Sequence, residues 1–149
     1  MSELKQRIQA ETVAAMKSGD TLVRDTLRLL SAAIKNREIE VGHELSDDEV
    51  VDVAVKEAKR RRESIEAFED AGRTELADKE KAELAILAPF LPEQLSDAEV
   101  DALIDGAIAS TGASSLADMG KVMGLVMAEA KGKVDGGTVQ SRVKARLQG

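Results

Sequence analysis

Cysteine, tryptophan and tyrosine are absent from this 149-residue sequence, and Phe68 and Phe90 are its only aromatic residues. Without cysteine there can be no disulfide bond, no thiolate zinc site and no thiol nucleophile. A core must be built from Ala, Leu, Val, Ile and Met. No apolar run approaches the roughly 18 residues that a membrane-spanning helix needs, and the MSELKQRIQAE start has no apolar signal core. We therefore expect a cytoplasmic protein that does not enter a membrane.

Sequence motifs that would identify a class of enzyme are also absent. The sequence contains no HExxH, GxSxG or P-loop pattern. The single histidine, His43, falls in an expected loop, where a lone histidine is usually an ordinary surface residue. The Gly-Lys pairs at 120–121 and 132–133 lack the earlier glycine of a nucleotide-binding loop. We predict no catalytic residue, no metal ligand and no cofactor.

The apolar pattern predicts an all-α protein, because no segment alternates with the period of two that a strand requires. A first helix over residues 2–17 should end at Ser18-Gly19, and a second, capped by Asp20, should end at Gly42. Apolar stripes at steps of three and four mark the inner faces of both helices. The stripes are Leu4, Ile8, Thr12, Ala15 and Met16, then Leu22, Val23, Leu27, Leu30, Ala33 and Ile34.

The stretch from Ser46 to Ser96 organises the rest of the chain. Ser46 and Glu49 form an S-x-x-E capping box, which predicts a long helix that ends at Gly72. Thr74 is a plausible cap for a fourth helix. Since proline cannot donate a backbone hydrogen bond, this helix should end or kink at Pro89.

After Pro92 the pattern predicts three shorter helices. A second capping box, Ser96 with Glu99, opens the first of them, which Gly112 ends. Ser115 should cap the next, in which Gly124 would suit a close helix approach, and Asp135 should cap the last. We therefore predict a helical N-terminal domain of about four helices over 1–92 and a three-helix C-terminal domain over 96–149.

Charge is distributed unevenly along the chain. The net charge is −7, yet residues 119–149 carry six bases against two acids, so this segment could attract a polyanion. An ordinary solvated surface is the alternative. The run Lys59–Arg62 is less suitable, because acids one helical turn away can neutralise it. The expected pairs are Asp52–Lys56, Glu57–Arg61, Lys59–Glu63 and Arg62–Glu66.

Three segments carry a family resemblance: LRLLSAAIKNREIE, KRRRESIEAFEDAGRTELADKEKAELAILAPFLPEQLS and DMGKVMGLVMAEAKGKVDGGTVQSRVKARL. Their order and spacing over nearly the whole chain resemble the YqeY family. One departure is Phe90, where a tyrosine before Leu-Pro is common. The resemblance implies a helical N-terminal domain followed by a three-helix C-terminal domain.

The resemblance extends to the C-terminal module of the GatB subunit of tRNA-dependent amidotransferase, which helps to bind tRNA. Lys121, Gly124, Lys131 and Gly132 match that tail pattern, and charge adds four further bases. The predicted RNA-binding residues are Lys121, Lys131, Gly132, Lys133, Arg142, Lys144 and Arg146.

Three function classes follow from these observations. The first is an accessory module that binds tRNA or other RNA and has no active site of its own. The second is a component of a glutamine-dependent carbon–nitrogen ligase, which needs partner subunits because the GatB catalytic domain is missing. The third is a protein-interaction module. The expected partners are RNA and proteins of the amidotransferase or aminoacyl-tRNA synthetase type.

Overall fold

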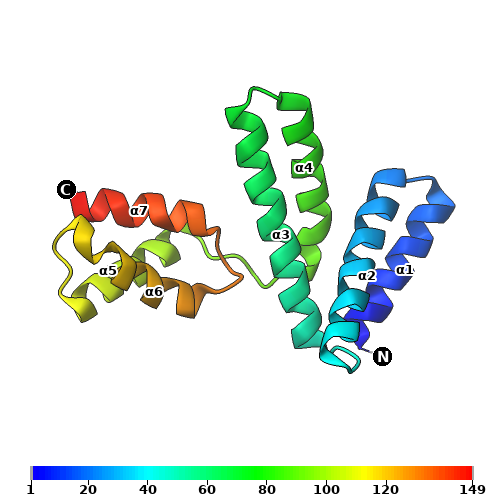
Figure 1. The fold of residues 1–149 in the computed structure, drawn as a ribbon, viewed down its shortest axis with the longest axis horizontal. Coiled ribbons are helices and arrows are strands. Elements are labelled where there is room, and N and C mark those ends of the chain that lie inside the picture. The colour runs from blue at the N-terminus through cyan, green and yellow to red at the C-terminus, as the bar shows by residue number, and fades with distance from the viewer. Residues whose placement is uncertain (1, 149) are drawn as a thin grey trace. The chain divides into compact units, whose positions relative to one another are not determined.

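The computed structural model describes residues 2–148, and within them it contains α-helices, two short 3₁₀ turns and no strand (Figure 1). The predicted all-α class is confirmed. The chain divides into two compact units, residues 1–91 and residues 92–149. None of the helices between residues 2 and 148 combines the length and the apolar character needed to cross a bilayer.

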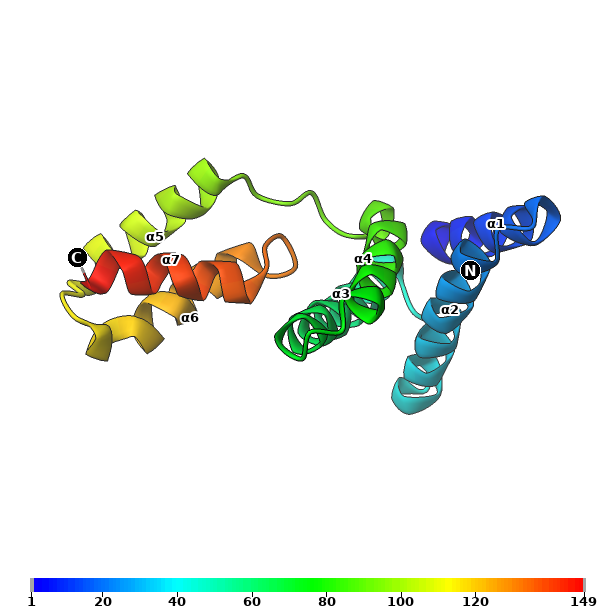
Figure 2. The same ribbon diagram turned by 90° about the horizontal axis from the view of Figure 1, so that it is seen from above.

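The N-terminal unit consists of two helical hairpins, α1 with α2 and α3 with α4 (Figure 2). Its core combines aliphatic side chains from all four helices with Phe90, which is 2% exposed. The guanidinium of Arg7 lies 4.9 Å from the centroid of the Phe90 ring. The helices are α1 (Glu3–Ser18), α2 (Thr21–Val41), α3 (Asp47–Asp70) and α4 (Thr74–Leu87), followed by a 3₁₀ turn over Ala88–Phe90.

Local capping signals place most of these helix ends. Both hydrogen bonds of the capping box between Ser46 and Glu49 form at the start of α3, and Asp20 accepts from Val23 N–H at the start of α2. Helix α4 ends at Leu87, before Pro89, as predicted. Met16, assigned to the inner stripe of α1, is instead 50% exposed.

The predicted cap at Thr74 is wrong. Gly72 adopts a left-handed conformation, and Arg73 N–H donates to Phe68 C=O at the end of α3. These are the features of a Schellman motif. Because the motif already places Arg73 at the boundary, Thr74 becomes the first residue of α4, and no side chain caps that helix.

A charged network joins the start of α1 to the end of α2. The Lys5 ammonium lies 2.7 Å from Glu38 Oε2, and the same carboxylate accepts from the backbone N–H of Leu45. Both contacts favour the ionised form, so the pKa of Glu38 lies below its ordinary value of 4.5. The loop after α2 is therefore tied to α2 through Glu38, and Glu38 is tied to α1 through Lys5.

Replacing Glu38 with glutamine should lower the free energy of unfolding at neutral pH by about 1–2 kcal/mol, since charged hydrogen bonds are lost. A carboxyl with a lowered folded pKa stabilises the fold above its unfolded pKa, and this contribution disappears as pH falls through the folded value. The parent should therefore lose stability below about pH 4.5 more steeply than Glu38→Gln. Urea denaturation from pH 3 to 7 measures both effects. Glu40→Gln, on the exposed side of the same helix, is the control, and an equal response of the two variants would contradict the prediction.

The C-terminal unit contains α5 (Asp97–Thr111), a 3₁₀ turn (Leu116–Asp118), α6 (Met119–Ala130) and α7 (Gly136–Gln148). The Asp118 carboxylate accepts from Ser114 and Ser115 N–H, which forms a tight turn ahead of α6. Asp135 caps α7 through Gly137 N–H, as predicted. Gly124 does not permit a close helix approach, because no atom lies within 4 Å of the position its Cβ would take. The core residues are Val100, Ile104, Ala107, Val122, Val126, Val139, Val143 and Leu147.

The segment of the C-terminal unit that precedes α5 is short, and its end is bound to the turn after α6. Leu95 N–H donates to Lys133 C=O at 2.7 Å, and the Gln94 amide donates to Gly132 C=O at 2.9 Å.

Glu93, exposed and just before these contacts, lies outside the helices. Limited digestion with a glutamate-specific protease should therefore cut first after Glu93, and mass spectrometry of the fragments identifies the site. An earlier cut inside α3 would contradict the long helix, and two stable fragments would support independent folding of the predicted domains.

Candidate functional site

Four of the predicted RNA-binding residues are exposed lysines that form no ion pair with any residue between 2 and 148. Lys121 lies near the start of α6, Lys131 and Lys133 lie in the turn after it, and Lys144 lies on α7. Because α6 and α7 run in opposite directions, Lys121 and Lys144 belong to one end of this helix pair and the other two lysines to the opposite end (Figure 1).

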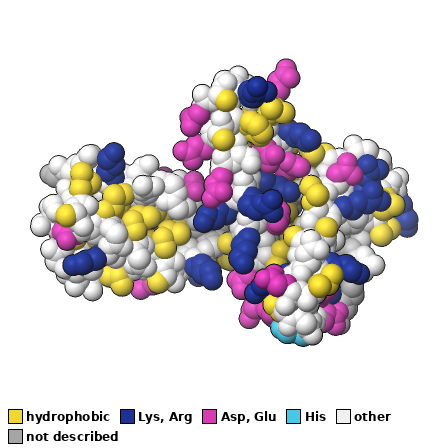
Figure 3. Space-filling view, in the orientation of Figure 1, with side chains coloured by type: hydrophobic (Ala, Val, Ile, Leu, Met, Phe, Trp, Pro, Cys, Tyr) yellow, Lys and Arg dark blue, Asp and Glu magenta, His cyan; other side chains and the backbone are white. Residues whose placement is uncertain are grey.

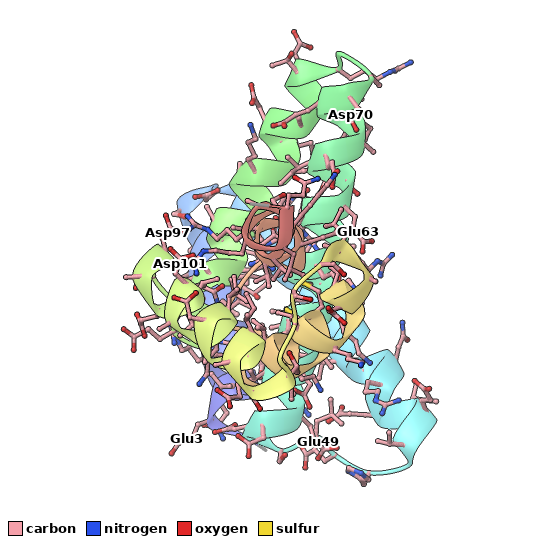
Figure 4. The ribbon with its side chains drawn as sticks, turned by 90° about the vertical axis from the view of Figure 1, so that its left-hand side faces the viewer. Glu3, Glu49, Glu63, Asp70, Asp97 and Asp101 are labelled. Atoms are coloured by element: carbon pink, nitrogen blue, oxygen red, sulfur yellow. The ribbon has the colours of Figure 1, made fainter. Side chains whose placement is uncertain are left out.

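The two predicted arginines are in a different situation. Arg142 bonds Asp101 through Nη1 at 3.0 Å and Asp97 through Nη2 at 3.0 Å, and Arg146 pairs with Asp105. Asp97 and Asp101 occupy the same side of α5 (Figure 4). The segment has few acids near in sequence, but the fold supplies three from α5. We call this set the α5–α7 ion-pair ladder.

The turn around Gly132 is held in place. Its carbonyl accepts from the Gln94 amide, Lys133 N–H donates to Ala130 C=O, and Gly132 adopts a φ of +76°. The segment after Pro92 therefore binds this turn through Gln94. Lys131 and Lys133 consequently extend from a fixed backbone.

The surface around these lysines is mixed in character. From Pro92 onward the sequence has six bases and eight acids, a net charge of −2. Hydrophobic side chains cover part of the visible face of this unit (Figure 3). Within the unit, Leu116 and Leu125 are each 44% exposed. Any attraction to a polyanion must therefore come from the local lysine pairs and not from the unit as a whole.

The central basic run is only partly a surface feature. Of its four expected ion pairs, the structure forms Glu57–Arg61 at 3.0 Å, and Arg60 also reaches Glu57 at 3.4 Å. The other three do not form. Arg61 is 7% exposed, because α2 and α4 cover this face of α3. A buried arginine was not foreseeable from the charge run alone.

Arg61 borders a hollow of about 370 Å³ between α2, α3 and α4. Glu57 and Arg61 enter it from α3, Glu80 and Glu83 from α4, and Asn36 from α2. We call this the carboxylate hollow. Acidic and basic side chains intermix over α3 and α4 (Figure 3). Residues 2–148 contain no group of three His, Asp or Glu side chains arranged to hold a metal ion.

Two polar groups of the hollow are in unfavourable surroundings. Arg61 Nε is buried without a hydrogen-bond partner. Burial and the neighbouring Glu83 carboxylate raise the pKa of Glu80 above its ordinary value. Leaving such groups unmatched is costly, since an unsatisfied charged donor costs more than the 1–3 kcal/mol of a neutral one. Unmatched buried groups in a hollow are typical of functional sites.

Known proteins resemble the chain along most of its length. Residues 5–147 match the family model described as "Yqey-like protein". A protein of Pyrenophora tritici-repentis named "Altered inheritance of mitochondria protein 41, mitochondrial" is 30% identical over 93% of this chain and 77% of its own length. The protein of that name in Lachancea thermotolerans is 34% identical, over 60% of this chain and half of its own. A protein of Schizosaccharomyces pombe described as uncharacterised is 32% identical over 60% of this chain and 73% of its own.

The family match spans both units and includes all seven described α-helices apart from the first residues of α1 and the last of α7. The relatives agree with it over segments of 90 to 141 residues. The names of the first two describe inheritance of mitochondria and a mitochondrial location, and none of the three names assigns a reaction. The chain belongs to the family of YqeY-like proteins.

Proposed function

We propose that this protein is an RNA-binding accessory module that uses the lysines of its C-terminal unit to hold tRNA or a similar RNA. The observation that carries the proposal is the set of four exposed lysines without carboxylate partners, Lys121, Lys131, Lys133 and Lys144. Lysine is a mobile point charge suited to phosphate contacts that carry no sequence information. The resemblance to the tail module of GatB supports the same function.

The spacing of the lysines suits a nucleic acid backbone. Helix α6 has 12 residues, so its ends are about 18 Å apart at 1.5 Å per residue. The two lysine pairs therefore contact phosphates several nucleotides apart on one strand or on facing strands. Binding through so few phosphates is weak, on the order of the micromolar range of non-specific complexes.

The ion-pair ladder changes the roles of the two arginines in this proposal. Arg142 and Arg146 hold α7 against α5, and their charges are already matched by aspartates. Their contribution is to fix the helix that carries Lys144. The binding set is accordingly the four lysines with the backbone of the Gly132 turn.

The proposed partners are proteins that handle tRNA, of the amidotransferase or aminoacyl-tRNA synthetase type. Such a partner would supply the chemistry if the protein acts as a component of a glutamine-dependent carbon–nitrogen ligase. We retain a cytoplasmic location as part of the proposal, since a mitochondrial location is stated only in the names of relatives.

Titration of labelled tRNA at several salt concentrations tests the proposal. The double variant Lys131→Ala with Lys133→Ala should weaken binding several-fold at low salt and reduce the slope of log K against log salt, because each phosphate contact releases counterions. Lys59→Ala with Arg60→Ala is the matched control. Both side chains are exposed, and this double variant also removes two positive charges. Arg61 is unsuitable as a control because it is buried.

Two results would contradict the proposal. Equal weakening by the tail pair and the control pair would indicate diffuse attraction without a defined surface. No binding by the parent at low salt would leave the protein-interaction module as the better reading. Circular dichroism of each variant verifies that the helices are retained.

A further inference from the structure

The C-terminal unit has no side chain suited to stacking on an unpaired base. Proteins hold single-stranded RNA largely by stacking its bases on aromatic rings or on arginine planes. From Pro92 onward the sequence contains no Phe, Tyr, Trp, His or Asn. Its two arginines, Arg142 and Arg146, are bound by aspartates in the α5–α7 ion-pair ladder. Recognition of unstacked bases is therefore not available to this unit.

Helix α7 has an exposed face that carries polar groups and no acid. Four exposed residues lie within about 100° of one another around this helix, and they are Gln140, Ser141, Lys144 and Gln148. We call these residues the α7 polar face. The helix contains no Asp or Glu, and its two arginines pair with α5 on another side. The face therefore presents two amides, a hydroxyl and an ammonium, and none of the four bonds another side chain between residues 2 and 148.

These groups match what an RNA duplex displays. The A-form helix has a wide, shallow minor groove lined by 2′-hydroxyls, whereas side chains cannot read its deep, narrow major groove. A 2′-hydroxyl donates and accepts hydrogen bonds, and so do glutamine and serine side chains. Residues 140–148 span about 12 Å at 1.5 Å per residue, so the face can meet several hydroxyls in succession.

We propose that the RNA bound by this unit is double-stranded and that the α7 polar face lies in its minor groove. Gln140, Ser141 and Gln148 contact 2′-hydroxyls. Lys144 and the lysines of the turn before α7 contact phosphates beside the groove. This inference rests on the proposed RNA-binding function and specifies its substrate as a duplex of any sequence, such as a stem of a folded RNA.

The hydroxyl contacts give the site a selectivity that its lysines cannot supply. Phosphates are common to RNA and DNA, so lysine contacts alone do not separate the two. The 2′-hydroxyl is the group by which a protein distinguishes RNA from DNA. The parent should therefore prefer an RNA duplex both to a DNA duplex and to single-stranded RNA.

Fluorescence anisotropy of the full chain at low salt tests this preference with four labelled ligands. They are an RNA duplex of about 16 base pairs, the length that spans two successive minor grooves, one strand of that duplex alone, a DNA duplex of the same sequence, and tRNA. The RNA duplex should bind at least about fivefold more tightly than the DNA duplex and the single strand, as expected from the loss of one or two hydrogen bonds.

A double variant locates the selectivity on α7. Gln140→Ala with Ser141→Ala should reduce the ratio of RNA-duplex to DNA-duplex affinity about threefold or more. The slope of log K against log salt should stay the same, because no phosphate contact is removed. Gln9→Ala with Ser31→Ala is the matched control, since it removes the same two side-chain types from exposed positions of the N-terminal unit.

The outcomes separate this inference from the function on which it rests. Binding of tRNA with no preference for the RNA duplex over the DNA duplex or the single strand would overturn the inference and leave the proposed function in place. An unchanged ratio in the Gln140 and Ser141 variant would show that α7 does not lie in the groove. No binding of any of the four ligands by the parent would overturn both.

Discussion

Replacing Val126 with aspartate should unfold the C-terminal unit. Val126 is 1% exposed and packs with Val122, Val139 and Val143 in the core between α6 and its neighbours. Burying an unpaired carboxylate costs several kcal/mol, and a unit of under 60 residues rarely has more than about 3–5 kcal/mol of stability. Met123, which the sequence places on the same stripe, is only partly buried and is a weaker test.

The measurement is far-ultraviolet circular dichroism during urea titration, since the chain has no tryptophan or tyrosine to report by fluorescence. Helices α5, α6 and α7 contain 15, 12 and 13 residues, so roughly a third of the helical signal should be missing before urea is added. Leu125→Asp is the control, because its side chain is 44% exposed one position away. An unchanged unfolding curve for Val126→Asp would show that this face is not a core.

Truncating Leu30 to alanine should destabilise the N-terminal unit by about 2–5 kcal/mol, the range for a large buried side chain that leaves a cavity. Leu30 is 1% exposed in α2, within a cluster that includes Leu27, Ile34 and Val50. Few bulky groups are available to collapse into the space, because Phe90 is the single aromatic residue of that cluster. We therefore expect a value in the upper half of this range.

The neighbouring residue supplies a control with the same chemistry. Leu29 is 53% exposed, so Leu29→Ala should change the free energy of unfolding by no more than about 0.5 kcal/mol. Urea midpoints of the two variants give the comparison directly. Similar midpoints for Leu29→Ala and Leu30→Ala would mean that α2 does not present the face described here.

Helix ends could be predicted from the sequence where the residues that set them lie within one helical turn of one another. The capping boxes at Ser46 and Ser96 involve residues three positions apart, and both form as predicted. The ends of α2 and α4 were predictable for the same reason, from Gly42 and from Pro89. The prediction of a cap at Thr74 was wrong because the end of α3 and the start of α4 share one short turn. The hydrogen bond from Arg73 N–H to Phe68 C=O ends α3 and leaves Arg73 as the residue before α4.

Contacts between distant segments could not be read in the same way. Arg142 and Asp101 are 41 positions apart, so the sequence alone does not show that an aspartate of α5 neutralises an arginine of α7. The burial of Arg61 likewise depends on α2 and α4, which cover one face of a run that looks entirely hydrophilic. Of the predicted RNA-binding residues, the lysines retain exposed charge, and the binding role of the whole set stays a prediction.

The ion-pair ladder implies a rule for how related sequences vary. Asp97, Asp101 and Asp105 repeat every four residues on α5, and Arg142 and Arg146 repeat in the same way on α7. A single reversal of sign would place like charges opposite one another, whereas exchanging the signs of both rows would preserve every attraction. Positions 97, 101 and 105 should consequently change sign together with 142 and 146 across the family, as a coupled evolutionary unit.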